Sequence, residues 1–294
     1  MSFKRILVPL DGSQLAERAL IPALAFAEMM LAKVFVFRIA IPLSLNLDPK
    51  LYQRIIELRQ NEANCYLRSI QSRFSSSPAE IETYVAVGRG TRPIINFVKE
   101  NEIDLIFMTS HGDYGVNRWI YGSVAHRVLH HAPCAKVIIY PQMIIEPFSI
   151  THILVPLDGS LLAEQALRPA IALAEAMSAE LTLLGVMKSQ LFEQWATFRS
   201  RHDDFVESEE LELNDYLQRV KVSVTDSPVT VSTWINTGVV TESINEFAND
   251  HQVDLIVMCN HGYFGIKRWV FGSVIDNVLR GANGITLVIH HQEA

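Results

Sequence analysis

The chain has 294 residues, of which 49% are hydrophobic and 19% are charged. This composition supports a sizeable core and excludes an intrinsically disordered chain. The formal net charge of −7 argues against a broad nucleic-acid-binding surface, and the length suggests two domains as readily as one.

Cysteine usage and hydropathy indicate the compartment. Cys65, Cys134 and Cys259 are far apart and outside any CxxC motif, which is typical of a reducing environment. No apolar run reaches the length of a membrane span, and the first residues lack the apolar region of a signal peptide. Ten histidines show no metal-ligand spacing. We therefore expect a cytoplasmic protein with no nucleic-acid or membrane partner and no metal site.

Strands and helices alternate along the first half of the chain. The apolar run "RILVPL" ends at the turn signal "DGS", and residues 13–32 follow with helical spacing. Pro22 lies inside that helical stretch and predicts a kink. Further strands are expected at 33–40, 81–87, 104–110 and 135–140, and further helices at 50–74, 92–101 and 122–131. Such alternation predicts a parallel sheet covered on both faces, with right-handed crossovers.

The second half repeats this order. Residues 5–28 return at 152–175 with a shift of 147, and residues 103–112 return at 253–262 with a shift of 150. A period near 150 residues is too long for a solenoid and indicates a duplicated domain. The segment "PQMIIEPFS" carries two prolines and is the expected linker. We therefore predict domains at residues 1–142 and 150–294.

An aspartate follows the first strand of each copy, Asp11 in one and Asp158 in the other. Open parallel sheets bind ligands at the carboxyl ends of their strands, where a carboxylate can accept hydrogen bonds from ribose hydroxyls. The same residues fit a plain turn, in which Asp forms an Asx-turn and Ser13 or Ser160 caps the next helix. The two interpretations are compatible, and both stay open.

A glycine-containing loop follows the fourth strand of each copy. "SHGDYGVNRWIYGSV" begins at Ser110, and "NHGYFGIKRWVFGSV" begins at Asn260. Each loop has nine residues between its histidine-linked glycine and the glycine that opens the next helix. A glycine and a serine at a helix start suit a phosphate group, because unpaired N–H groups and the helix dipole favour anions. A helix cap is the alternative, since recent duplication preserves a loop without any function.

Several enzyme classes are disfavoured. The chain lacks a Walker A motif, a GxGxxG motif and a Gly-x-Ser-x-Gly elbow. His111 and Asp113 suggest acid–base chemistry, but the second copy has Tyr263 in place of the aspartate. Cys259 aligns with Thr109, so a thiol is not required at that position, and we expect a small buried residue. No catalytic residue is predicted.

The combined motifs resemble the universal stress protein family. The resemblance rests on "ILVPLDGS" and on "DLIFMTSHG…GSVAHRVLHHAPC" with its copy "DLIVMCNHG…GSVIDNVLRGANG". It implies two tandem, doubly wound α/β domains, each a five-stranded parallel sheet of order 3-2-1-4-5 and of the adenine-nucleotide alpha hydrolase-like type. It also implies ATP or AMP as ligand, with or without Mg, and no tightly bound redox cofactor.

The resemblance also assigns nucleotide-binding residues through the family pattern G-x2-G-x9-G-[ST]. It implies that the aspartates meet the ribose, the end of the second strand meets adenine, and the loop glycines with the helix start hold the phosphates. The implied residues are Asp11, Ile39, Thr109, Gly112, Gly122, Ser123 and Val124 in the first copy, and Asp158, Val186, Cys259, Gly262, Gly272, Ser273 and Val274 in the second.

Both copies depart from the pattern at its first glycine, which is Thr109 in one and Cys259 in the other. The HxGH signature of related nucleotidyl transferases and the SGGxDS signature of ATP pyrophosphatases are absent. We therefore expect a nucleotide-binding regulatory protein of the stress response. The alternatives are a nucleotide-free interaction protein of the same fold, which works by dimerisation, and a very slow ATPase.

The last strand of each copy is expected at a sheet edge. "KVIIY" and "ITLVIH" are apolar, and an open apolar edge is an aggregation hazard unless it is paired. In the resembling family these edges meet across a two-fold axis. We therefore predict an intramolecular pseudo-dimer of the two copies, with a homodimer of whole chains as a further possibility.

Overall fold

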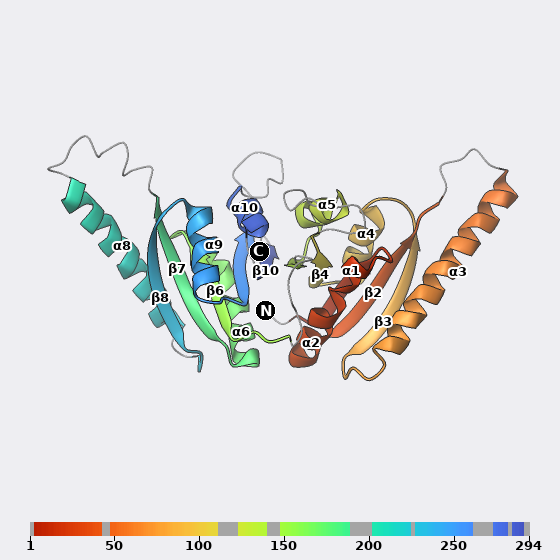
Figure 1. Cartoon of the computed structure of the whole chain (residues 1–294), viewed down its shortest axis with the longest axis horizontal. Coiled ribbons are helices and arrows are strands. Elements are labelled where there is room, and N and C mark those ends of the chain that lie inside the picture. Colours follow the sequence, from red (N-terminus) through yellow and green to blue (C-terminus); the bar gives the residue numbers. More distant parts are fainter. Residues whose placement is uncertain are drawn as a thin grey trace. The chain divides into compact units, whose positions relative to one another are not determined.

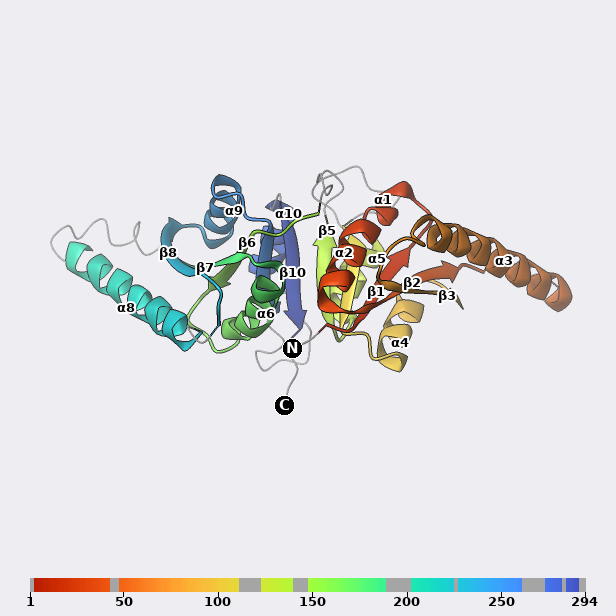
Figure 2. The same cartoon turned by 90° about the horizontal axis from the view of Figure 1, so that it is seen from below.

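The computed structural model describes residues 3–42, 48–110, 123–139, 148–188, 202–224, 227–260, 273–281 and 284–290. The chain divides into two compact units, one ending at Phe148 and the other beginning at Ser149. Each unit is a twisted sheet with helices on both faces (Figures 1 and 2). The expected linker lies mostly outside the described residues.

The first unit contains one five-stranded parallel sheet of order β3-β2-β1-β4-β5. Its elements follow the predicted alternation. They are β1 (Arg5–Leu10), α1 (Gln14–Glu17), α2 (Leu20–Met30), β2 (Lys33–Ala40), α3 (Pro49–Arg73), β3 (Glu80–Val87), α4 (Arg92–Glu100), β4 (Leu105–Thr109), α5 (Ser123–His131) and β5 (Ala135–Ile139).

The second unit repeats this arrangement, with strand order β8-β7-β6-β9-β10. The predicted doubly wound α/β class is therefore confirmed, and both units have the order 3-2-1-4-5. The elements are β6 (His152–Leu157), η1 (Ala163–Ala166), α6 (Leu167–Met177), β7 (Glu180–Lys188), α8 (His202–Ser223), β8 (Val231–Gly238), α9 (Val240–Asp250), β9 (Leu255–Asn260), α10 (Ser273–Gly281) and β10 (Ile285–His290).

The first helical stretch of each unit differs from the prediction of one kinked helix. In the first unit α1 ends at Glu17 and a separate helix, α2, begins at Leu20. In the second unit the short 3₁₀ helix η1 precedes α6. Pro22 and Pro169 each occupy the first turn of the second helix, where a missing N–H costs no hydrogen bond. The chain therefore breaks before the proline instead of bending at it.

Side chains of β2 alternate between two helix layers. Phe35 and Phe37 contact Phe97 of α4, with ring centroids 5.8 and 5.0 Å apart. Arg38 points to the opposite face, where its guanidinium carbon lies 4.3 Å from the ring centroid of Tyr66 on α3. Helices α3 and α4 thus cover opposite faces of this sheet, as right-handed crossovers require.

The ends of each sheet are also fixed by the strand order. Strands β5 and β10 each lie at an edge of their own unit's sheet, and β3 and β8 lie at the other edge. The pairing of the two units across β5 and β10 stays a prediction. Among the described residues, no helix is long and apolar enough to cross a membrane.

Candidate functional site

The strand order places the candidate site at the carboxyl ends of β1 and β4, and of β6 and β9. The chain leaves β1 toward β2 on one side, and it leaves β4 toward β5 on the other side. The two central strands therefore flank a topological switch point, where open α/β sheets bind ligands. Asp11 and Ser110 follow the two strands in the first unit, and Asp158 follows β6 in the second.

Both aspartates form the turn that the sequence predicted. Oδ1 of Asp11 accepts hydrogen bonds from N–H and Oγ of Ser13, at 2.9 and 2.6 Å. Oδ1 of Asp158 accepts from N–H and Oγ of Ser160, at 3.0 and 2.6 Å. The turn interpretation is confirmed in both copies. These bonds involve one carboxylate oxygen, and both aspartates are exposed, so the turn also holds each carboxylate at the edge where open α/β sheets bind ligands.

The serine of each turn also accepts a hydrogen bond from the backbone of the following helix, and Ser13 is the N-cap of α1. Oγ of Ser13 accepts from N–H of Ala16 at 3.0 Å, and Oγ of Ser160 accepts from N–H of Ala163 at 3.1 Å. Each hydroxyl therefore donates to an aspartate and accepts from a backbone N–H, which fixes the backbone between the strand and the helix.

The glycine after each aspartate has different surroundings in the two units. Gly12 has φ of +94° and Gly159 has φ of +84°, a conformation that favours glycine. A β-carbon on Gly12 would lie 2.5 Å from Nη1 of Arg38. A β-carbon on Gly159 would have no described atom within 4 Å. The space beside this turn is filled in the first unit and open in the second, as far as the described residues extend.

A tyrosine lies near the aspartate of each unit. Oη of Tyr66 donates to Oε1 of Glu17 at 2.7 Å, and Nη2 of Arg73 donates to the other oxygen of Glu17 at 2.5 Å. Burial raises the pKa of Tyr66, and the hydrogen bond to Glu17 and the charge of Asp11 add to this rise. In the second unit, burial and the charge of Glu164 raise the pKa of Tyr216. Both tyrosines therefore stay protonated and neutral.

The position of Arg38 is occupied by Gly185 in the second unit. A β-carbon on Gly185 would lie 2.9 Å from both methyl carbons of Leu213 on α8. The residue of α3 that corresponds to Leu213 is Ala63, which is 2% exposed. The first unit therefore has the larger residue on the strand and the smaller one on the helix, and the second unit has the reverse. The next residues, Ile39 and Val186, are half-buried at the strand ends where the resemblance expects adenine.

The fourth strand of each unit ends in buried side chains. Thr109 and Cys259 are both 6% exposed, so the prediction of a small buried residue at Cys259 is confirmed. Sγ of Cys259 lies 3.9 Å from Oε1 of Gln165, and burial raises the pKa of the thiol to about 12. Cys259 is therefore neither a thiolate nucleophile nor a thiolate ligand at neutral pH.

The predicted phosphate residues are only partly described. Gly112, Gly122, Gly262 and Gly272 lie outside the described residues. Ser123 and Val124 begin α5 and are exposed, and Ser273 and Val274 begin α10. Within the described ranges, no group of three His, Cys, Asp or Glu side chains is placed to hold a metal ion. The fold brings the helix starts and the aspartates to the same edge, while the phosphate contacts stay a prediction.

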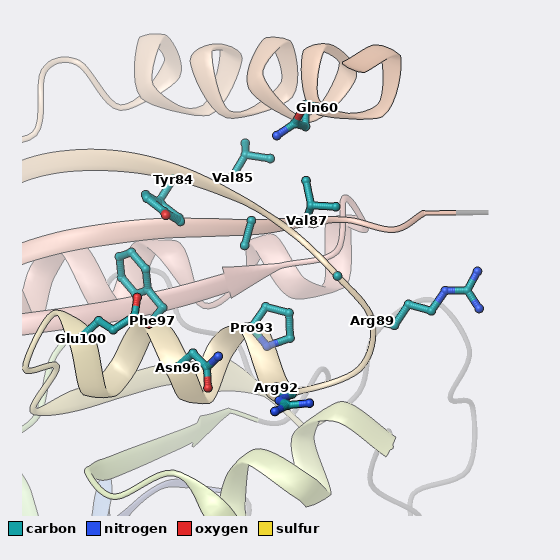
Figure 3. A pocket seen from close by; sticks show the side chains of 12 residues that line it. Gln60, Tyr84, Val85, Val87, Arg89, Arg92, Pro93, Asn96, Phe97 and Glu100 are labelled. Atoms are coloured by element: carbon teal, nitrogen blue, oxygen red, sulfur yellow. The ribbon is translucent and has the colours of Figure 1, made fainter. Parts of the chain in front are cut away.

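One pocket was not predicted from the sequence. It has a volume of about 520 Å³ and lies at the β3 edge of the first unit (Figure 3). Tyr84 and Phe97 line it, and Arg89 and Arg92 lie toward one end of it. The second unit has Val239 and Glu242 in place of the two arginines. None of the predicted nucleotide residues lines this pocket, so it does not belong to the repeated site.

The fold and the repeated turn define a tandem doubly wound α/β protein with two candidate ligand sites, one at the carboxyl edge of each sheet. The family model described as "Universal stress protein family" matches residues 2–141 and again residues 149–290. The chain therefore belongs to the universal stress protein family.

Individual relatives agree with this assignment. The chain is 29% identical over 153 residues to universal stress protein Sll1388 of Synechocystis, covering 47% of this chain and 99% of the relative. It is 29% identical over 155 residues to universal stress protein MJ0577 of Methanocaldococcus jannaschii, covering 48% of this chain and 96% of the relative. A solved universal stress protein from Archaeoglobus fulgidus matches 99% of this chain and 100% of its own length, with a TM-score of 0.70 and 18% identity. That structural match shows the fold alone.

Proposed function

We propose that this chain is a regulatory protein of the stress response that binds ATP or another adenine nucleotide at the carboxyl edge of its sheets. One observation carries the proposal. The turns at Asp11 and Asp158 hold a carboxylate beside the topological switch point with nearly the same hydrogen-bond distances in both units. Family membership supports the same assignment.

The chemistry of the site suits a nucleotide. An exposed carboxylate held at the strand end accepts hydrogen bonds from the ribose hydroxyls. The N–H groups at the starts of α5 and α10 favour the phosphates, with Ser123 and Ser273 as further donors. The strand ends at Ile39 and Val186 offer backbone groups to the adenine ring. Gly122 and Gly272 complete the proposed phosphate loops without a side chain.

The proposed role is binding and not turnover. Both loops keep a histidine, His111 in one and His261 in the other, but Asp113 is replaced by Tyr263 in the second copy, so the two loops repeat no acid–base pair. We therefore expect any release of phosphate from ATP to stay below about one turnover per second. A steady-state phosphate assay on repurified protein measures this rate, and a faster rate that copurifies with the protein would contradict the proposal.

The test replaces both loop glycines, as Gly122→Val with Gly272→Val. A β-carbon at these positions should collide with a phosphate oxygen, so we expect ATP binding to be lost by titration calorimetry. The fold should remain, because neither glycine belongs to a strand or helix of the described sheets, and thermal unfolding checks this. If the parent binds ATP and the double variant binds it equally well, the loops are helix caps and not phosphate sites.

Dimerisation without a nucleotide is the second candidate function. Two observations favour it: the buried side chains Thr109 and Cys259 replace the first glycine of the family pattern, and Arg38 fills the space beside Gly12. The same titration separates the two candidates, because this second function predicts a parent protein that binds neither ATP nor AMP.

A further inference from the structure

We infer that the two sites are not equivalent, because Arg38 occupies the nucleotide subsite of the first unit and leaves binding to the second unit. This inference rests on the proposed function and states which of the two sites is competent. It makes Arg38 the residue that determines how many nucleotides one chain binds.

The position of the guanidinium carries the argument. Arg38 projects from the end of β2, and its guanidinium reaches the turn that follows β1. Nη1, Nη2 and Cζ would lie 2.5, 2.8 and 3.0 Å from a β-carbon on Gly12. The group is held there by the ring of Tyr66. A ligand that touches the Gly12 turn on this side meets the guanidinium.

The second unit has the same turn without this occupant. Asp158 and Gly159 reproduce the hydrogen bonds and the positive φ of the first turn. Gly185 has no side chain to reach across from β7, and no described atom lies within 4 Å of a β-carbon on Gly159. Among the described residues, the space beside Gly159 is therefore free for a ligand, whereas Arg38 occupies the space beside Gly12.

The rest of the packing is adjusted to this difference. Leu213 on α8 packs against Gly185, whereas α3 carries the much smaller Ala63 at the corresponding position. The extra volume of Arg38 in the first unit is thus compensated on the neighbouring helix. Because cores are close-packed, each pair of residues fits only its own unit.

Arg38 could instead be a direct contact for the ligand. The structure argues against this role, because Nη1 is buried and makes no hydrogen bond to any described residue. A ligand atom cannot reach a buried nitrogen unless the side chain moves. Displacement of the guanidinium would also require loss of its contact with the ring of Tyr66.

The test transfers the second unit's residues into the first, as Arg38→Gly with Ala63→Leu in the full chain. ATP is titrated by calorimetry, with and without Mg²⁺. We expect one ATP per chain for the parent and two for this double variant. Adding Asp11→Ala to the double variant should remove the second ATP. Asp158→Asn in the parent should weaken its single site.

A reciprocal variant, Gly185→Arg with Leu213→Ala, should bind no ATP. Arg73→Ser on α3 is the matched control, because it also introduces the residue of the second unit in place of an arginine and should leave the stoichiometry at one. Thermal unfolding identifies any variant that fails to fold, and the two double variants then serve as independent tests.

Each outcome decides the matter. Two ATP molecules per parent chain, or a double variant of Arg38 that still binds one, would overturn the inference while the proposed function stands. Weaker binding in the Arg38 variant than in the parent would make Arg38 a ligand contact and also overturn it. No ATP or AMP binding by the parent and by the folded Arg38 variant would overturn the proposed function as well.

Discussion

The turn after the first strand is nearly identical in the two units, but the side chains around it are not. The Oγ–Oδ1 distance is 2.6 Å in both, and both glycines have positive φ. Arg38 packs beside the first turn, whereas Gly185 stands at the corresponding place in the second unit. The comparison teaches that duplication preserved the local backbone geometry while the volume beside it was redistributed between sheet and helix.

Repetition alone does not identify a binding residue. Asp104 and Asp254 are also repeated, and they lie at the opposite, amino-terminal edge of the sheets. Asp104 accepts from N–H of Lys4 at 2.7 Å, and Asp254 accepts from N–H of Thr151 at 2.7 Å. Each carboxylate joins the start of β4 or β9 to the start of β1 or β6 in the same unit, which is a structural role. What distinguishes Asp11 and Asp158 is their place at the switch point.

The largest predicted effect concerns Lys136 on β5, where the second unit has Thr286. Lys136 is fully buried, its Nζ has no partner among the described residues, and burial lowers its pKa to about 8. Below pH 8 the lysine is charged in both states, so the folded state bears the full cost of burying the charge. Lys136→Met should therefore raise the free energy of unfolding by about 3 kcal/mol at pH 7.

The pH dependence of this effect has a definite sign. Between pH 8 and the ordinary lysine pKa of 10.5 the folded lysine loses its proton first, so the parent regains stability relative to the variant. Cys134 interacts electrostatically with Lys136, but burial raises the pKa of its thiol to about 12, so the thiol stays neutral over this range. Denaturant unfolding at pH 7 and pH 10 measures the difference. Lys136→Met should therefore gain less stability over the parent at pH 10 than at pH 7, and Thr286→Val should show no difference between the two pH values. An equal gain from Lys136→Met at both pH values would contradict this prediction.

Much of the fold could be predicted from the sequence, because short apolar strands alternate with helices and each strand ends at a turn signal. The bounds of β2 agree with the expectation, and the Asx-turns follow from "LDGS". The break before Pro22 could not be predicted, because the helical spacing continues through it. Contacts between distant elements were also missed. The exchange of Arg38 and Ala63 for Gly185 and Leu213 depends on which residues face each other across a sheet and a helix.

The next prediction separates the turn from the charge at the proposed competent site. Asparagine keeps the side-chain oxygen that accepts from Ser160 but removes the negative charge. Asp158→Asn should therefore weaken ATP binding by about 1.5–3 kcal/mol, or roughly tenfold to a hundredfold, with little change in stability. Asp158→Ala should weaken binding as much and also destabilise the turn. Calorimetry and thermal unfolding on both variants measure these effects, and unchanged affinity in both would limit Asp158 to the turn.

The smallest predicted effect compares the serines of the two turns. Ser13 is buried and begins the α-helix α1, whereas Ser160 is half-buried and precedes the 3₁₀ helix η1. Ser13→Ala should cost about 1 kcal/mol, because the N–H of Ala16 loses its acceptor in a site that water reaches poorly. Ser160→Ala should cost less, since water can replace the hydroxyl at the more exposed turn. Denaturant unfolding of the two variants, each compared with the parent, measures the difference. An equal or larger loss for Ser160→Ala would mean that exposure does not decide the strength of these hydrogen bonds.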